Sequence, residues 1–363
     1  MRPLLRVVTW IHRWTGLAVG IIVVFLAVTG AAMVFRAQLE ARIDPGLLTI
    51  APCSQSRSLD SIVAAARSAH RGKVSDVFLY GSPVASTMVR FADNDQIYVD
   101  GCTARVLGEQ ARYAGFFGSL ESLHKGRFAK RAGKLAARTG AFGLAALLIL
   151  GIFAWWPRRK RALAFNPQLR GRALVLNVHT TLGAYASIAL LVAAATAIPI
   201  SLGWSPEKNL VPALPKRFHD PPAVTFERDW RAARSAIPQA FRWASIRVPR
   251  TQRPMEIVIV TASAPHDEAH SFVYVDPRNA RVLASYPYDK LDAATKLRFW
   301  LLAVHTGRAG GPLVESLLFL GMIAVPALAY TALDSFVRGL AMQLRHLPRA
   351  ATPPRPARSL PRR

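Results

Sequence analysis

Acidic residues are scarce in this chain of 363 residues, which has 21 Asp and Glu against 47 Lys and Arg, and only two cysteines. So few cysteines exclude a disulfide-rich miniprotein, and a hydrophobic content of 52% excludes intrinsic disorder. Glycine-rich loops of the Gly-x-Gly-x-x-Gly and Walker types are also missing, so the sequence has no evident site for a nicotinamide, a flavin or ATP. The formal net charge of +26 could indicate a nucleic-acid partner. The basic residues flank long apolar segments, however, which favours a membrane surface and no nucleic acid.

Four apolar segments hold most of the uncharged sequence: residues 15–35, 139–156, 173–200 and 309–333. About 20 apolar residues are enough for a helix to cross the hydrocarbon core, so we expect four transmembrane helices. The arginines before the first segment would also fit a signal peptide, but the segment is longer than an ordinary signal core and predicts a retained anchor. Glu315 is the one acidic residue in these segments.

Charge in the short connections predicts how the helices are oriented. The segment before the first apolar run carries three arginines, the segment 157–172 carries six basic side chains, and neither has an acidic one. Under the positive-inside rule, these segments and the basic tail are cytoplasmic. The two long connections are mixed in charge and large enough to be domains, so we expect them on the other side. The predicted units are residues 1–35 (helix), 36–134 (outer domain), 135–156 (helix), 157–172 (basic loop), 173–202 (helix), 203–304 (outer domain), 305–333 (helix) and 334–363 (basic tail).

Matched motifs divide the chain into two similar halves. His12-Arg-Trp-Thr-Gly16 opens the first apolar segment, and His179-Thr-Thr-Leu-Gly183 opens the third. His124-Lys-Gly-Arg127 precedes the second apolar segment, and His305-Thr-Gly-Arg308 precedes the fourth. The order of the motifs is the same in both halves, which indicates a tandem repeat.

Each half contains two apolar segments, so both halves enter the membrane in the same direction. Such parallel repeats are related by an axis along the membrane normal. This symmetry would pair His12 with His179 at the cytoplasmic face and His124 with His305 at the outer face. Shorter matches support the repeat, namely Thr29 with Thr196 and the Tyr-Val-Asp sequences at Tyr98 and Tyr274, which we expect to close the outer domains.

Periodicity predicts a small α+β unit in each outer domain. The first has helical spacing at residues 59–70, then strand-like runs at 74–80, 87–91 and 96–99. The second has a helix at 230–240, then strands at 245–248, 256–261 and 271–275. The Pro- and Arg-rich end from Leu347 is expected to be disordered.

The four paired histidines are candidate metal ligands. A histidine in an apolar segment is costly and tends to have a function, although any single one could be an ordinary interfacial residue. Neutral imidazole binds zinc, copper and haem iron. Zinc usually takes three or four ligands with Cys or a carboxylate among them, and both cysteines lie in the first outer domain. Two facing imidazoles better suit the axial positions of a b-type haem, so we expect one haem b between His12 and His179 and another between His124 and His305.

Glycines and arginines follow the histidines at fixed spacing. Gly16 and Gly183 lie one turn after a histidine on the same helix face, where a missing side chain would leave a flat surface for a porphyrin. Packing of helices through Gly16-x-x-x-Gly20 is the alternative. Arg127 and Arg308 follow the outer histidines by three residues, and a guanidinium pairs well with a haem propionate. Snorkelling to lipid headgroups would explain these arginines nearly as well.

The remaining histidines have no evident ligand role. We expect His70 to end a helix, His219 to lie in a loop and His346 to lie in the tail. His266-Asp-Glu-Ala-His270 matches neither order of a zinc-protease motif and predicts a solvated loop. Cys53 and Cys102 would face an oxidising compartment, where they could form a disulfide or remain two buried thiols.

Together, the motifs resemble the PepSY-associated transmembrane helix family. The resemblance rests on His12-Arg-Trp-x-Gly, the Trp155-Trp156-Pro157 exit with its basic loop, His179 and the two His-x-Gly-Arg sequences, and it covers residues from about 5 to about 340. The Tyr-Val-Asp sequences look like the ends of PepSY domains. Three positions depart from the family pattern, namely Thr180, where arginine often follows the histidine, Ala332, where glycine is expected after a threonine, and Glu315, an unusual acid in the fourth span.

The resemblance implies a bacterial inner-membrane protein with cytoplasmic termini, a four-helix transmembrane bundle and two periplasmic α+β PepSY-like domains. It also implies a di-haem oxidoreductase of the ferric-siderophore reductase type. Electrons would pass from quinol or a cytoplasmic reductase, through the haems held by the matched histidines, to ferric siderophore in the periplasm.

Two other functions are open from the sequence. One is a non-catalytic envelope protein whose PepSY domains bind peptides or restrain proteases. The other is a transporter with proton-relay histidines, which a parallel repeat permits, although the sequence lacks the broken helices and central acids expected of one. We favour the di-haem electron carrier because only that function uses all four matched histidines.

Overall fold

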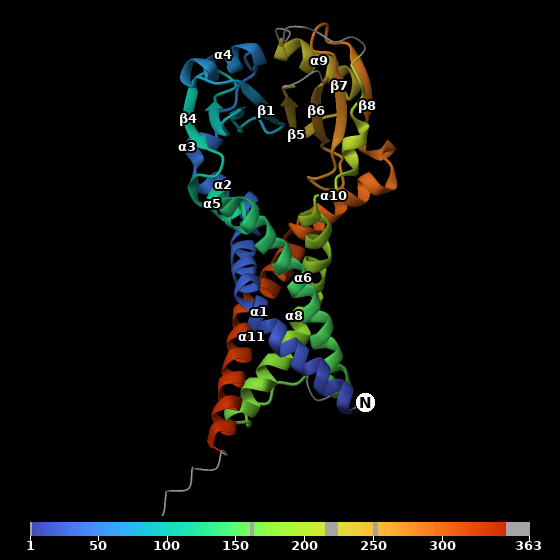
Figure 1. Ribbon diagram of the computed structural model, residues 1–363. Coiled ribbons are helices and arrows are strands. Elements are labelled where there is room, and N and C mark those ends of the chain that lie inside the picture. The colour runs from blue at the N-terminus through green and yellow to red at the C-terminus, as the bar shows by residue number, and fades with distance from the viewer. Residues whose placement is uncertain (1, 160–162, 215–223, 250–252, 346–363) are drawn as a thin grey trace, which may run out of the picture.

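A computed structural model describes residues 2–159, 163–214, 224–249 and 253–345 (Figure 1). The described chain has two parts. Four long helices form a bundle, and a β-sheet with its covering helices forms a head at one end of that bundle (Figure 1). The N-terminus lies at the opposite end of the bundle from the head (Figure 1).

The bundle consists of α1 (Arg2–Met33), α6 (Lys130–Trp155), α8 (Gly171–Leu202) and α11 (Gly311–Arg345). Among the described residues, these four helices, with α6 taken from Arg127, are long and apolar enough to cross a membrane. The four predicted apolar segments therefore form the four predicted helices. Their outward surfaces carry exposed apolar side chains such as Ile21 and Ile188, which suits contact with lipid.

Each bundle helix packs against two others, so that α1 and α8 lie on one diagonal and α6 and α11 on the other. Small residues allow the close approach. A Cβ placed on Gly143 of α6 would lie 2.7 Å from Val19 of α1, and one on Gly321 of α11 would lie 2.8 Å from Ala189 of α8. Between the helices, Val23, Leu190 and other apolar side chains form the buried core.

Two helices are longer than the apolar segments indicated. Helix α1 begins at Arg2, well before residue 15, and α11 continues to Arg345, past the predicted end at Leu333. Asp334 ends the apolar run but does not end the helix, because its carboxylate pairs with Arg338 one turn on, at 2.7 Å. The tail from residue 346, including the predicted disorder from Leu347, lies outside the described residues.

The head is built on one antiparallel sheet of eight strands in the order β4-β3-β2-β1-β5-β6-β7-β8. The strands are β1 (Val74–Tyr80), β2 (Thr87–Phe91), β3 (Asp95–Val99), β4 (Val106–Ala111), β5 (Phe241–Arg247), β6 (Met255–Thr261), β7 (Ser271–Val275) and β8 (Val282–Tyr286). Strands β1 and β5 pair from Asp76 with Arg247 to Tyr80 with Trp243. The prediction of two separate α+β domains is therefore wrong in this respect: each predicted unit contributes four strands, and the two sets join edge to edge.

The Tyr-Val-Asp sequences lie in the last hairpin of each set of strands, in keeping with the expectation that they close the outer units: the Tyr and Val residues end β3 and β7, and Asp100 and Asp276 begin the turns that lead to β4 and β8. In both turns the aspartate N–H donates to an arginine carbonyl five residues on, Asp100 to Arg105 and Asp276 to Arg281. These two strands were missed because they are only partly buried and show little alternation.

Two helices cover the face of the sheet that is turned away from the bundle (Figure 1). They are α4 (Leu59–Ala69) and α9 (Phe226–Ala236), and their apolar sides share one core with alternate residues of the strands. Helix α9 begins and ends four residues earlier than the predicted helix at 230–240, because Pro238 is incompatible with a helix interior.

Shorter elements connect the head to the bundle. Helix α5 (Gly115–His124) packs on α1, and α10 (Ala293–His305) packs on α8. The others are α2 (Arg36–Ile43), α3 (Pro45–Leu48) and the 3-10 turns η1 (Arg127–Ala129), η2 (Trp156–Arg158), η3 (Pro206–Leu210) and η4 (Tyr288–Lys290). On the bundle side of the sheet, α10 contributes Phe299 to a second core with Phe272 and Tyr274 of β7.

A disulfide joins Cys53 to Cys102, with 6.0 Å between the Cα atoms, and so settles a pairing that the sequence left open. It ties the segment before α4 to the turn between β3 and β4, across a sequence separation of 49 residues. Closing a loop of that length in the unfolded chain stabilises the folded state by about 4 kcal/mol in the chain-entropy account.

Replacing both cysteines by serine should therefore lower the free energy of unfolding of the head by roughly 2–4 kcal/mol. Thermal unfolding of the full chain in detergent, followed by circular dichroism, measures this loss. A reducing agent should lower the midpoint of the natural chain by the same amount and leave that of the double variant unchanged. Equal midpoints for the two proteins without reductant would contradict the prediction.

Candidate functional site

Two histidines face each other across the bundle at its end remote from the head. They are His12 of α1 and His179 of α8, and their ring centroids are 6.3 Å apart. Each ring is anchored to the adjacent antiparallel helix: His12 Nδ1 lies 3.1 Å from the carbonyl oxygen of Leu147, and His179 Nδ1 lies 3.1 Å from that of Leu328. We call His12 and His179 the far pair.

A second pair lies where the head joins the bundle. His124 is the last residue of α5 and His305 the last of α10, and their ring centroids are 6.4 Å apart. His124 Nδ1 lies 3.1 Å from Thr29 Oγ1 of α1, and His305 Nδ1 lies 3.0 Å from Thr196 Oγ1 of α8. We call His124 and His305 the head pair.

The hydrogen bonds fix the tautomer of all four rings. A carbonyl oxygen only accepts, so His12 and His179 donate from Nδ1. The hydroxyls of Thr29 and Thr196 donate to carbonyl oxygens one turn earlier, Phe25 at 2.8 Å and Val192 at 2.7 Å, and so accept from the histidines. Each ring therefore keeps its lone pair on Nε2, and within the described residues no Nε2 of the four has a hydrogen-bond partner. This arrangement is typical of histidines whose second nitrogen binds a metal.

The spacing of each pair suits one metal ion bound by both rings. Metal–imidazole bonds are about 2.0–2.1 Å long, so two rings on opposite sides of one ion have centres about 6 Å apart. The far pair and the head pair, at 6.3 and 6.4 Å, both meet this requirement. The donor set of two neutral imidazoles matches the axial ligands of a haem better than a closed zinc site.

Gly16 and Gly183 leave open space beside the far pair. A Cβ on either would meet a single atom within 4 Å, Cδ2 of Leu147 or of Leu328, in both cases at an ordinary 3.6 Å. A Cβ on Gly20 would meet nothing within 4 Å. These glycines therefore make no close contact between helices, unlike Gly143 and Gly321, which argues against the packing alternative; the flat surface for a porphyrin stays a prediction.

Two further glycines make room for the rings themselves. A Cβ on Gly151 of α6 would lie 3.2 Å from Cε1 of His12, and one on Gly30 of α1 would lie 3.1 Å from Cε1 of His124. Gly151 also stands one turn after Leu147, whose carbonyl it leaves accessible to His12. Ala332 holds the equivalent place after Leu328, so this small residue serves where the family pattern has glycine.

The His-x-Gly-Arg motifs end α5 and α10 and turn the chain into the bundle. Gly126 and Gly307 have φ values of +63° and +80°, which favour glycine. A Cβ on Gly126 would lie 2.1 Å from the carbonyl oxygen of Gly133, so the turn also needs glycine for its close approach.

The two motif arginines make contacts inside the protein that the sequence did not suggest. The Arg127 guanidinium lies over the ring of Tyr113, 5.3 Å from its centroid. Arg308 forms an ion pair with Glu268 at 3.2 Å. Binding of haem propionates by these arginines stays a prediction.

Several contributors to the site escaped the sequence analysis. Thr29 and Thr196 were noted as matched positions without a role, and the structure shows that they orient the head pair. The Leu147 and Leu328 carbonyls are backbone groups that carry no side-chain signal. Thr331, which lies 3.0 Å from His179 Nδ1, has no counterpart contact at His12 among the described residues.

The sequence predicted a solvated loop at His266 and His270. This prediction is wrong, because the loop is largely buried. His266 is 2% exposed, its ring packs against Trp300 of α10, and both its nitrogens lack partners among the described residues. Burial, followed by the positive charge of Arg298, lowers the pKa of His270 to about 3. The loop is held down because Glu268 between the two histidines binds Arg308. His219 and His346 lie outside the described residues.

His70 ends α4 at its C-cap, as expected, and binds two carboxylates. Its Nε2 lies 2.9 Å from Asp93 and its Nδ1 lies 3.1 Å from Glu109. Asp95 also lies close, so that within the described residues His70, Asp95 and Glu109 form a group with metal-ligand atoms less than 4.8 Å apart. The hydrogen bond to Asp93, and then the bond to Glu109, raise the pKa of His70. An ion-pair network accounts for this cluster.

The raised pKa predicts a pH-dependent contribution to stability. Protonated His70 stabilises the folded state fully below its unfolded pKa of about 6.5, and this contribution is lost as the pH rises through the higher folded pKa. His70→Gln should therefore lower the unfolding midpoint of the chain at acid pH and have little effect at alkaline pH. Thermal unfolding across that pH range measures the difference. A constant difference between the two proteins would contradict the assignment.

Comparison with known proteins bears on the whole chain. A family model described as PepSY-associated TM region matches residues 9–337, which include α6, α8, most of α1 and α11, both histidine pairs and the eight-stranded sheet. No curated protein matches the chain.

Proposed function

Since the chain belongs to the PepSY-associated TM region family, we propose that it carries electrons across a bacterial inner membrane through two b-type haems. One haem would lie between His12 and His179, and the other between His124 and His305. The observation that carries this proposal is the arrangement of the four rings as two pairs, at spacings that suit one iron each, with no hydrogen-bond partner at any Nε2 among the described residues.

The residues around each pair would hold the imidazoles in place and neutral. The Nδ1–H hydrogen bonds direct each Nε2 toward the pair axis and increase its basicity as a ligand. Gly16 and Gly183 would leave room beside the far pair for the porphyrin. Bound haem would supply one-electron chemistry that no side chain of this protein offers.

The two sites are displaced along the bundle, as electron transfer through a membrane requires. Thr29, which binds His124, follows His12 on α1, and Thr196, which binds His305, follows His179 at the same interval on α8. At about 1.5 Å per residue this places the pairs about 25 Å apart along the axis. Two porphyrins would divide this distance into shorter steps.

Charge and cysteine chemistry support the orientation. The far end of the bundle carries basic segments without acids, which favours the cytoplasmic side. The Cys53–Cys102 disulfide lies in the head, which favours an oxidising compartment such as the periplasm. Electrons from quinol or a cytoplasmic reductase would then enter at the far pair and leave at the head pair, where ferric siderophore is the proposed acceptor. Peptide binding by the head alone would give the histidine pairs no role.

Replacing either head histidine by alanine should remove the haem at the head pair and leave the far pair loaded. We expect haem content to fall from about two to about one per polypeptide, because a single axial imidazole holds haem weakly. Pyridine haemochrome analysis and reduced-minus-oxidised spectra measure this. His70→Ala, which changes a histidine remote from both pairs, should keep both haems. A colourless natural protein would contradict the proposal, and so would a haem content of about two per polypeptide in His124→Ala and His305→Ala.

Removing the threonine hydroxyls should weaken the head pair without deleting a ligand. In a Thr29→Val, Thr196→Val double variant, the Nδ1–H groups lose their acceptors, and haem affinity at that site should fall roughly 10- to 100-fold, as is typical for such outer-shell changes. Titration of haem into the stripped full-length protein measures the affinity. Thr9→Val is the control, because among the described residues the Thr9 hydroxyl bonds to the carbonyl of Leu5 alone and not to a histidine. An affinity unchanged from the natural protein would refute the role of the threonines.

A further inference from the structure

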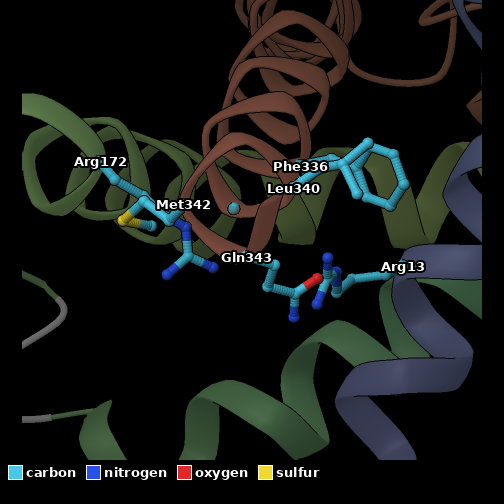
Figure 2. Close-up of a pocket in the computed structure, with 7 residues that line it drawn as sticks. Arg13, Arg172, Phe336, Leu340, Met342 and Gln343 are labelled. Carbon is cyan, nitrogen blue, oxygen red and sulfur yellow. The ribbon is translucent and has the colours of Figure 1, made fainter. Parts of the chain in front are cut away.

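A pocket of about 420 Å³ opens at the far end of the bundle, between α1, α8 and α11. Arg13 and Arg172 line it together with Phe336, Leu340, Met342 and Gln343 of α11. Figure 2 shows Arg13 and Arg172 extending from two different helices toward the turn of α11 that carries Met342 and Gln343. The pocket therefore combines positive charge with an apolar wall.

Neither arginine has a carboxylate partner among the described residues. The Arg172 Nε donates to the carbonyl oxygen of Ser335 at 3.2 Å, and the Arg13 guanidinium lies 5.5 Å from the centroid of the Phe336 ring. Asp334 is the one acidic residue in this part of α11, and it pairs with Arg338 instead. Two guanidinium groups that share a pocket without a counter-charge favour an anionic ligand.

The pocket begins beside the far pair and extends away from the head. Arg13 follows His12 directly on α1, whereas Phe336 and Gln343 follow Leu328, the partner of His179, about two and about four turns later on α11. At about 1.5 Å per residue, these two residues lie roughly 12–22 Å farther along α11 than Leu328. Leu340, Met342 and Gln343 therefore line the pocket near the end of the membrane-spanning helices.

The apolar wall continues onto the lipid-facing surface of α11. Leu340 and Met342 are 47% and 45% exposed, and Val337 beside them is 54% exposed. Acyl chains can follow this surface while a headgroup occupies the charged end. Basic pockets between transmembrane helices at a cytoplasmic surface are suited to anionic lipid headgroups.

We propose that this pocket binds the phosphate headgroup of one anionic phospholipid. Arg13 and Arg172 hold the phosphate, the Gln343 carboxamide hydrogen-bonds the rest of the headgroup, and Leu340 and Met342 contact the acyl chains. The proposal requires that the four helices span a bilayer and does not depend on haem.

Native mass spectrometry of the full chain in detergent, titrated with phosphatidylglycerol or phosphatidylcholine, tests the site. We expect one phosphatidylglycerol to bind in preference to phosphatidylcholine. Each arginine near a membrane surface is worth about a fivefold change in affinity, so the Arg13→Gln, Arg172→Gln double variant should bind about 30-fold more weakly. Arg170→Gln removes a charge near the same end but outside the pocket, and it should bind normally. Arg13→Lys with Arg172→Lys keeps the charge and should retain most of the preference even if the glutamine variant folds poorly.

Four outcomes would overturn the proposal. Equal binding of both lipids, or equal weakening by Arg170→Gln, would mean general charge attraction. Displacement of the lipid by millimolar inorganic phosphate would mean a site for free phosphate. Loss of haem from the double variant with unchanged lipid binding would mean that the arginines hold haem propionates instead.

Discussion

Hydrogen bonds from the Nδ1 atoms of four histidines to neighbouring helices determine how the paired imidazole rings are oriented inside the bundle. Each bond ties an imidazole to a partner that can only accept: a backbone carbonyl at the far pair, and a threonine hydroxyl already committed as a donor at the head pair. The bonds therefore set the tautomer and the direction of the rings together. The glycines at positions 16, 30, 151 and 183 keep the space around the rings free. Packing of the bundle and placement of the ligands are thus parts of one arrangement.

Sequence periodicity predicted most of the helices and strands, but it did not predict how the two sets of strands pair with each other. Strands β1, β2 and β7 have the predicted bounds, because each is a short run of almost continuously buried residues that ends at a turn. Strands β4 and β8 were missed because they are half-exposed. The pairing of β1 with β5 was also missed, since an unpaired strand edge has no side-chain signature. The end of α11 was predicted too early because Asp334 ends the apolar run. Its charge does not end the helix, since Arg338 neutralises it one turn later.

Matched motifs predicted which histidines would meet, because side chains at equivalent places in two similar halves tend to approach a common axis. What anchors the rings could not be predicted in the same way. Two of the anchors are the backbone carbonyl groups of Leu147 and Leu328, which have no signature in the sequence. The contact of Arg308 with Glu268 joins a motif residue to a loop 40 residues away in sequence, and a spacing argument within the motif cannot reveal it.

The strand pairing at the centre of the head restricts how the molecule can move. Strands β1 and β5 are held by a ladder from Asp76 to Tyr80, reinforced by the ion pair between Arg247 of β5 and Asp76 of β1. Moving the two sets of four strands apart would break the β1–β5 hydrogen bonds in the middle of the sheet. The sheet therefore lies as one continuous layer on the bundle side of which α5 and α10 end in His124 and His305. In the proposed function, the position of the head pair would then depend on an immobile sheet and on two short helices beneath it.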